Sequence, residues 1–215
     1  MRSVSGGVRV LQGWYSAAVS EPAPALDPRF PNLRPEVVQS YLDAPEHLVA
    51  EVLDGELFTM PRPRTLHANA AGAVLVVLDP PFRRARGGPG GWVLLPEPEL
   101  HLGPRPDIVD PDLAGWRRER MPALPDEAAL TLAPDWVCEV LSERTEATDR
   151  GKKMRIYRRE KVSYVWLVSP TLKTLEVYKL ENERYTLLDT YEGNDPVRAE
   201  PFDAVDLDLG AFWEL

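Results

Sequence analysis

Two charged residues in the second half of the chain have neighbours that could put them to chemical use. Glu139 lies in the middle of the run WVCEVLS, where strand geometry places Val137 and Leu141 on the same face as its carboxylate. An ionised carboxylate between apolar neighbours costs several kcal/mol unless a cation, a metal ion or hydrogen-bond donors compensate it. We therefore expect a partner beside Glu139.

The partner that spacing suggests is a lysine on the following segment, RGKKMRIYRRE, which is helical by composition. Lys153 stands three residues before Ile156, so its side chain lies on or beside the apolar stripe of this helix. Lys152 shares part of that face, and helical geometry separates the two lysines only weakly. At this stage Glu139 and Lys153 are explained equally well by a structural ion pair and by a functional site.

The elements that position these groups follow from hydrophobic periodicity and turn residues. Helices are predicted over Arg34–Leu42, Thr65–Leu78 and Arg150–Glu160. Strand-like segments are predicted over Gly91–Gly103, Asp107–Trp116, Trp136–Ser142 and Ser163–Pro170, with hairpins turning at Asp54-Gly55 and Glu181-Asn182. This order predicts an α/β fold in which a central β-sheet is flanked by helices on both faces and carries added β-hairpins.

The domain organisation is simple. Residues 1–34 are rich in Ser, Gly, Ala and Pro and have no clear period, so we interpret them as an extension that is partly disordered. Residues 35–215 then form one domain.

Composition narrows the classes of protein. The single cysteine excludes an intrachain disulfide and favours a reducing compartment, and the N-terminus has no secretory pattern, so we expect a cytoplasmic protein. No apolar run approaches the length of a membrane span. The net charge of −9 argues against indiscriminate coating of nucleic acid, so any such contact must be local.

Several motifs in one order carry a resemblance to a known family. They are EVLDGELFTMPRP followed by His67, then PDLAGWRRER, EVLSERTEATDRGKKMRIY and YVWLVSP. Over about 35–213 the chain resembles the bacterial Uma-type family of "putative restriction endonucleases", a branch of the PD-(D/E)XK nuclease superfamily. The resemblance implies a restriction-endonuclease-like core with a central mixed β-sheet.

The resemblance also implies a function and a set of site residues. It implies a metal-dependent endonuclease that hydrolyses phosphodiester bonds, with Asp112 and Glu139 holding Mg²⁺ or Mn²⁺ and Lys153 positioning the attacking water. The main-chain carbonyl of Val140 is a third expected metal ligand. In the simplest superfamily pattern the lysine is two residues after the glutamate, where this chain has Leu141; the Uma-type pattern has it on the next helix, as here.

Other positions are left with open roles. Glu51 and His67 match positions that the family tends to keep. Turn or packing support explains Glu51 as well as catalysis does, and a helix-surface role explains His67 equally well. Asp107, in RPDIVD, competes with Asp112 as the metal-binding aspartate. The chain departs from the usual family residues at Glu143, Arg144, Lys161 and Ser169, which leaves the local turn and its substrate contacts open.

The expected partner is nucleic acid, with DNA favoured over RNA. Arg150, Lys152, Arg155 and Arg158 would hold phosphates, although a solvated helix face is the more common explanation of such a run. The hairpin after Pro170 could lie at a sheet edge and pair two copies into a homodimer. The alternative function is a nuclease-fold protein that has lost cleavage and acts in binding or assembly.

Overall fold

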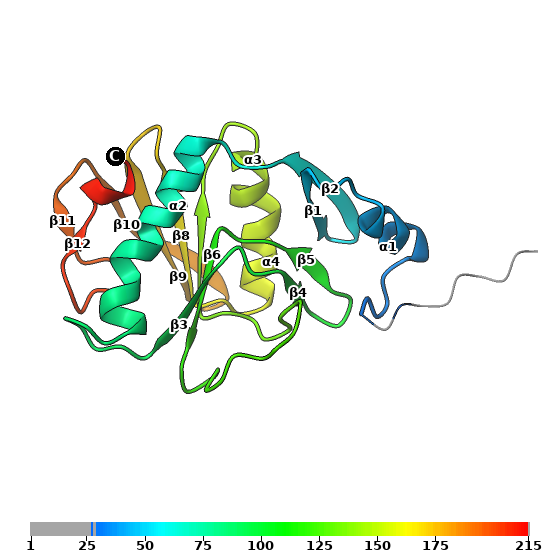
Figure 1. Ribbon diagram of the computed structural model, residues 1–215, viewed down its shortest axis with the longest axis horizontal. Coiled ribbons are helices and arrows are strands. Elements are labelled where there is room, and N and C mark those ends of the chain that lie inside the picture. Colours follow the sequence, from blue (N-terminus) through cyan, green and yellow to red (C-terminus); the bar gives the residue numbers. More distant parts are fainter. Residues whose placement is uncertain (1–26, 28, 215) are drawn as a thin grey trace, which may run out of the picture.

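The computed structural model describes residue 27 and residues 29–214, arranged as two main β-sheets and a short two-stranded sheet, with helices packed around them (Figure 1). The helices are α1 (Pro35–Leu42), α2 (Thr65–Leu78), α3 (Glu146–Thr148) and α4 (Met154–Arg159), with π-helical turns η1 (Asp79–Arg83) and η2 (Asp149–Lys153) and a 3-10 turn η3 (Gly210–Phe212). The strands are β1 (Leu48–Leu53), β2 (Glu56–Pro61), β3 (Trp92–Pro96), β4 (Leu100–Leu102), β5 (Asp107–Val109), β6 (Leu113–Arg117), β7 (Trp136–Val140), β8 (Tyr164–Ser169), β9 (Thr174–Glu181), β10 (Arg184–Glu192), β11 (Pro196–Val197) and β12 (Leu207–Asp208).

The larger sheet has six strands in the order β10-β9-β8-β7-β6-β3. Only β7 and β8 run parallel, and the helical segment from α3 through η2 to α4 connects them, as parallel neighbours require. The other pairs are antiparallel, so the sheet is mixed, as predicted. β10 is an edge strand, which agrees with the position expected for its hairpin.

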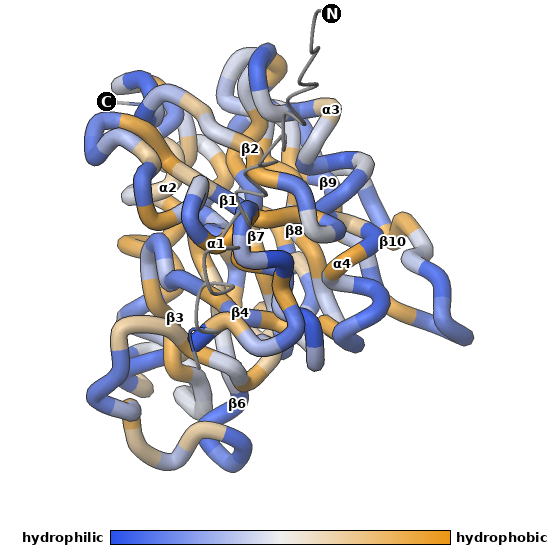
Figure 2. Tube along the Cα trace, turned by 90° about the vertical axis from the view of Figure 1, so that its right-hand side faces the viewer, coloured by the Kyte–Doolittle hydropathy of each residue, from blue (hydrophilic) through white to orange (hydrophobic). Residues whose placement is uncertain are grey.

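The two faces of this sheet bury separate hydrophobic cores, and apolar residues gather along β7 and β8 in the interior (Figure 2). On one face α2 packs through Ala70, Val74 and Leu78, which recur every four residues, beside a C-terminal segment that contributes Phe202. On the other face lies α4 with Ile156. Alternation along β7 sends its side chains into both cores, which is why the strand is apolar throughout.

The smaller sheet, in the order β2-β1-β5-β4, lies beside α4 and carries α1 on its far side. Asp54 and Gly55, both with positive φ, form the predicted two-residue turn between β1 and β2. Phe30 and Leu33 are buried against this sheet, so packing begins a few residues before the expected boundary at residue 35. The rest of the expected extension, residues 1–26 and 28, lies outside the described residues, as does residue 215.

Two strand predictions need correction. The segment Gly91–Gly103 forms two strands, β3 and β4, that belong to different sheets, and Asp107–Trp116 likewise divides into β5 and β6. Prolines occur at both divisions, at Pro96 and Pro111, and a proline cannot donate the ladder hydrogen bond that would continue a strand. The second hairpin turns at Asn182-Glu183, one residue later than predicted.

Among the residues that the structure describes, no helix combines the length and the apolar character needed to cross a membrane.

Candidate active site

A cleft of about 860 Å³ opens beside the start of β6 and the end of β7. It is also lined by residues of β1, the start of α2 and the turn η2. Its charged and histidine lining residues are Glu51, Arg62, Arg64, His67, Glu97, Asp110, Asp112, Glu139, Glu143, Arg144, Asp149 and Lys153. The cleft therefore collects residues from both sheets. Among them are the three predicted catalytic residues, Asp112, Glu139 and Lys153, and two residues whose roles were left open, Glu51 and His67.

Glu139 is almost completely buried, at 2% exposure, and faces α4 as the alternation of the strand predicts. The Tyr157 hydroxyl donates to its Oε1 at 2.5 Å, and the Lys153 ammonium lies 3.3 Å from its Oε2. The partner expected from the sequence is therefore present, together with a second donor.

Lys153 ends the π-helical turn η2 and points into the cleft among three carboxylates. Its Nζ lies 2.9 Å from Glu51 Oε1, 3.3 Å from Glu139 Oε2 and 3.5 Å from Asp149 Oδ1. Lys152, which helical spacing alone did not exclude, instead pairs with Glu56 at 3.3 Å outside the cleft. The extra residue of a π-helical turn rotates the following side chains, and such turns often occur at functional sites.

The electrostatics of this cluster follow from burial and an excess of acidic groups. Burial raises the pKa of Glu139 well above its usual range, and burial also raises that of Asp149. For Lys153 burial acts in the opposite direction, but Glu139 and Glu51 outweigh it and hold the pKa of the ammonium well above its ordinary value. These carboxylates therefore favour the ammonium form of Lys153.

Asp112 directly precedes β6 and lies next to Glu139 because of strand register. Leu113 pairs with Cys138 in the antiparallel β6–β7 ladder, so Asp112 lies opposite Glu139. Asp112 Oδ2 accepts the Val140 N–H at 2.7 Å, which fixes the carboxylate at the end of β7. Two acidic groups from neighbouring strands therefore meet at one edge of the sheet.

His67, in the first turn of α2, also reaches this edge. Its Nε2 lies 3.3 Å from Asp112 Oδ2, whereas its buried Nδ1 has no hydrogen-bond partner among the described residues. Burial opposes protonation of the imidazole, but hydrogen bonding to Asp112 and its charge raise the pKa of His67 above the ordinary value.

Asp107 lies elsewhere. Its carboxylate accepts the Asp54 N–H at 2.5 Å and pairs with Arg159, and it borders a second, smaller cleft rather than the one that contains Glu139. Of the two aspartates that the sequence left open, the structure brings Asp112 and not Asp107 to Glu139.

The four basic residues expected to hold phosphates do not line the cleft. Arg150 pairs with Glu146 and Glu176, and Arg155 lies 3.8 Å from Asp54, while Arg158 is exposed. With Lys152 paired to Glu56, three of the four bind acidic groups of this chain.

Sequence reasoning missed the basic residues that do line the cleft. They are Arg62 and Arg64, from the connection between β2 and α2, and Arg144, after β7. The signal was available in PRPR directly before a helix start and in the departure from the family pattern at Arg144.

Asp110 was missed as well. Its backbone N–H donates to Glu51 Oε1 at 3.0 Å. Within the part of the chain that the structure describes, its buried side-chain Oδ1 has no hydrogen-bond partner, and neither has Oε2 of Glu51. Burial, followed by the negative charge of Glu51, raises the pKa of Asp110 to about 7. The only signal in the sequence was its place in DPD, next to the predicted ligand Asp112.

The donor atoms suit a hard divalent cation. Within residues 27 and 29–214, no three His, Cys, Asp or Glu side chains already converge as a complete metal cage. Mg²⁺, however, is commonly held by one or two carboxylates and otherwise by water, and the cleft offers several carboxylate oxygens beside the imidazole of His67. The unpartnered buried oxygens of Glu51 and Asp110 and the excess of acid over base both favour a cation here.

A family model described as "Putative restriction endonuclease", Uma2, matches residues 37–210. The chain belongs to the Uma2 family. The matched region contains every residue that lines the cleft. No curated protein matches the chain.

A solved structure has the same fold as this Uma2 protein. It is described as that of a putative nuclease belonging to DUF820 from Anabaena variabilis, with a TM-score of 0.65 and 20% identity, over 82% of this chain and 96% of that one. The family and the restriction-endonuclease-like α/β fold support a nuclease-like function.

Proposed function

We propose that this Uma2 protein is a metal-dependent endonuclease that hydrolyses phosphodiester bonds of nucleic acid, with DNA as the favoured substrate. The observation that carries the proposal is the meeting of Asp112, Glu139 and Lys153 at one end of the cleft. Carboxylates from adjacent strands and an amine from the next helix are the groups that metal-assisted hydrolysis needs.

Asp112, Glu139 and the carbonyl of Val140 would hold Mg²⁺ or Mn²⁺, since all three line the cleft and supply oxygen ligands. When bound, the ion lowers the pKa of water and offsets negative charge on the phosphate. His67 Nε2 and the Val140 N–H both contact Oδ2 of Asp112, which holds this carboxylate in place before substrate binds.

Lys153 would orient the attacking water and donate to a phosphate oxygen as charge develops there. In the hydrolysis, the hydroxyl of water is added to phosphorus, the phosphorus–oxygen bond breaks, and the departing oxygen takes the remaining proton. Glu51, Glu139 and Asp149 keep the amine protonated, so Lys153 acts as a fixed cation and not as a base.

Phosphates flanking the reacting one would be held by Arg62, Arg64 and Arg144, which border the cleft on two sides. These residues take the place of Arg150, Lys152 and Arg155, whose charges are matched by acidic groups within the chain. Arg158 remains a candidate for a more distant contact.

The proposal is tested by cleavage of plasmid, linear duplex, single-stranded DNA and RNA in Mg²⁺ or Mn²⁺. We expect Asp112→Asn, Glu139→Gln and Lys153→Met each to lower cleavage by about a hundredfold or more, as loss of a main electrostatic group does. Glu119→Gln is the matched control, because Glu119 is exposed on the loop after β6. Cleavage that survives all three cleft substitutions refutes this site.

A second function is favoured by the saturation of Lys153 with carboxylates and of Glu139 with Tyr157 and Lys153. In that case the cluster is a structural ion pair, and the protein binds nucleic acid or assembles without cutting. Titration calorimetry with Mg²⁺ and Mn²⁺ separates the two functions. A catalytic metal site binds the ion in wild type, and the Glu139→Gln variant loses that binding.

We also propose a cytoplasmic homodimer that pairs through the β10 edge. The single cysteine is buried and suits a reducing compartment, and exposed Leu187 and Leu188 lie on β10. A monomeric mass by light scattering at micromolar protein concentration would exclude the dimer.

A further inference from the structure

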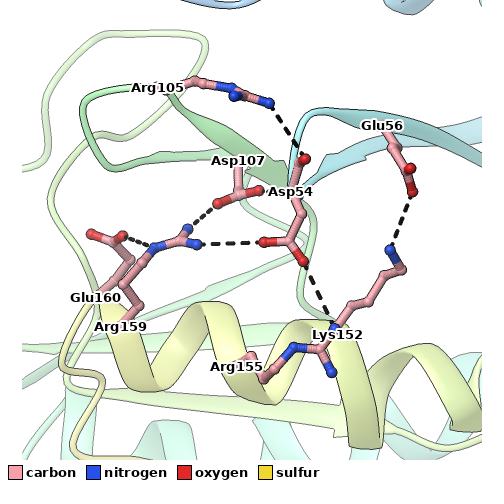
Figure 3. Close-up of polar contacts among 8 residues, drawn as sticks. All are labelled: Asp54, Glu56, Arg105, Asp107, Lys152, Arg155, Arg159 and Glu160. Carbon is pink, nitrogen blue, oxygen red and sulfur yellow. Dashed lines mark hydrogen bonds and ion pairs between the residues drawn. The ribbon is translucent and has the colours of Figure 1, made fainter.

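The basic face of η2 and α4 forms ion pairs with the four-stranded sheet and its β1–β2 turn, next to the cleft. Lys152, Arg155 and Arg159 recur at helical spacing and face acidic groups of the β1–β2 turn, β2 and β5 (Figure 3). The basic run of the sequence is thus occupied within the molecule.

Arg159 is the centre of this contact. Its guanidinium pairs with Asp107 through Nη2 and lies 3.5 Å from Asp54 Oδ1 through Nη1, while its Nε donates to Glu160 at 2.8 Å. Asp107 in turn accepts the Asp54 N–H at 2.5 Å. One arginine therefore joins the turn of the hairpin, β5 and the end of α4 (Figure 3).

The same helical segment holds β1 at a second point. Lys153, six residues before Arg159, pairs with Glu51, three residues before Asp54. Glu51 is also tied to β5 by the Asp110 N–H, at the opposite end of that strand from Asp107. Between these ties, β1 and β5 share only the pairing of Val52 with Ile108.

We propose that Arg159 is a positioning residue that holds β1 where Glu51 meets Lys153 in the cleft. Arg159 borders the second cleft and not the first, so any effect on the substrate site is indirect. Asp107 is 4% exposed at its side chain, and the guanidinium that covers it is about half-exposed, which gives a partly buried and directional contact. Lys153 shares its ammonium between Glu51 and Glu139, so the place of β1 sets the place of that charge.

Because the catalytic readout rests on the proposed nuclease function, the test also includes a readout that needs no cleavage. Hydrogen exchange of the β1 and β2 amides is compared in wild type, R159Q and the matched control R158Q, which alters the exposed neighbour on α4. We expect R159Q to speed exchange severalfold in these two strands and R158Q to leave it unchanged. Unchanged exchange in R159Q overturns the proposal whether or not the protein cuts nucleic acid.

The kinetic arm asks whether Arg159 acts through position. We expect R159Q to lower kcat by about tenfold to a hundredfold with KM unchanged, because a displaced catalytic group slows chemistry without removing substrate contacts. R159K keeps the charge but loses the fork that spans two carboxylates, so it should restore part of kcat and also serves if R159Q folds poorly. A rise in KM with kcat unchanged would assign Arg159 to substrate binding instead and overturn the proposal. Absence of cleavage in wild type would count against the proposed function alone.

Discussion

At the scale of single residues, the cleft is organised by pairs in which one side chain fixes another. Tyr157, fully buried on α4, donates to Glu139, and Val140 N–H does the same for Asp112. Each carboxylate thus has one oxygen held by a neutral donor. Such prepositioning lowers the cost of arranging ligands at the moment of reaction.

Tyr157→Phe tests this organisation. Loss of a buried hydrogen bond to a charged group costs about 1.5–3 kcal/mol, so we expect a lower free energy of unfolding in urea. We also expect a lower kcat, because Glu139 loses one of its two anchors. Tyr185→Phe is the control: its hydroxyl donates to the Val162 carbonyl away from the cleft, so it should lower stability without the loss of kcat. Equal kinetic losses in both variants would contradict a role for Tyr157 in the site.

Arg150 provides a prediction about pH. Its hydrogen bonds, with a smaller contribution from Tyr178, hold the pKa of Glu176 below the usual range. A carboxyl whose pKa is depressed by folding adds stability above its unfolded pKa of about 4.3, and that stability is lost as pH falls through the folded value. Arg150→Gln should therefore be less stable than wild type at pH 7, with a difference that shrinks toward pH 3 in denaturant titrations.

The same variant separates two roles of the basic run. Arg150→Gln should leave the affinity for DNA unchanged if Arg150 is a structural partner of Glu176. A clear loss of affinity without loss of stability would return Arg150 to the set of phosphate contacts.

The sequence could predict a residue's role only where the cause of that role lies in the residue's own strand or helix. Glu139 was predictable because a charge in an apolar strand needs a partner, and the structure supplies Lys153 and Tyr157. The pairing of Arg150, Lys152 and Arg155 with Glu176, Glu56 and Asp54 was not, because these acidic residues belong to hairpins remote in the chain. Hydrophobic periodicity indicates the buried face of one helix or strand, but it does not indicate which other element packs against that face.

At the scale of elements, the strand β6, which places Asp112 beside β7, depends on close packing around a glycine. Gly115 in its middle packs under two tryptophans: a Cβ there would lie 3.0 Å from Leu94 Cδ2, 3.0 Å from Trp136 Cε3 and 3.3 Å from Trp92 Cε3. The absence of a side chain thus lets large rings from both neighbouring strands cover the sheet.

Gly115→Ala should destabilise the protein by about 1–3 kcal/mol, as overpacking of a core does. Gly72→Ala in α2 is the opposite control, since no atom lies within 4 Å of its added Cβ, and it should stabilise by about 0.5–1 kcal/mol. Thermal or urea unfolding measures both. If both substitutions changed the free energy of unfolding in the same direction, the packing around Gly115 would be looser than described.

The elements themselves were largely predictable, and the exceptions have a physical cause. α2 begins and ends where its Ala-rich run and the following prolines predict, and both hairpins form. The division of two strand-like segments between two sheets was not predicted, because a proline marks where a strand stops but not which sheet receives the next one. Sheet membership is decided by tertiary packing.

At the scale of the whole molecule, a chain of net charge −9 must bring a polyanion to a cleft that is itself acidic at its base. Arg62, Arg64 and Arg144 border the cleft, and the buried carboxylates lie deeper. Binding of nucleic acid should therefore depend on a few local contacts and on a cation that offsets the acidic groups.

Salt dependence measures the number of these contacts. Arg64→Ala should weaken binding of duplex DNA and reduce the slope of log K against log salt by about 0.9, the value for one phosphate contact. Arg86→Ala is the control, because Arg86 is exposed and does not line the cleft. A slope that Arg64→Ala leaves unchanged would place the phosphates elsewhere on the surface.

The connection between β6 and β7 leaves the sheet at the end opposite Asp112 and Glu139, separated from them by the length of five-residue strands, about 16 Å. Its middle, residues 122–128, is exposed. The register that places Asp112 opposite Glu139 is set by pairing within β6 and β7, and not by this connection. A foreign peptide grafted at 124–126 should therefore be exposed to solvent and leave the activity of the cleft unchanged. This loop is accordingly the natural attachment point for a label or an affinity handle.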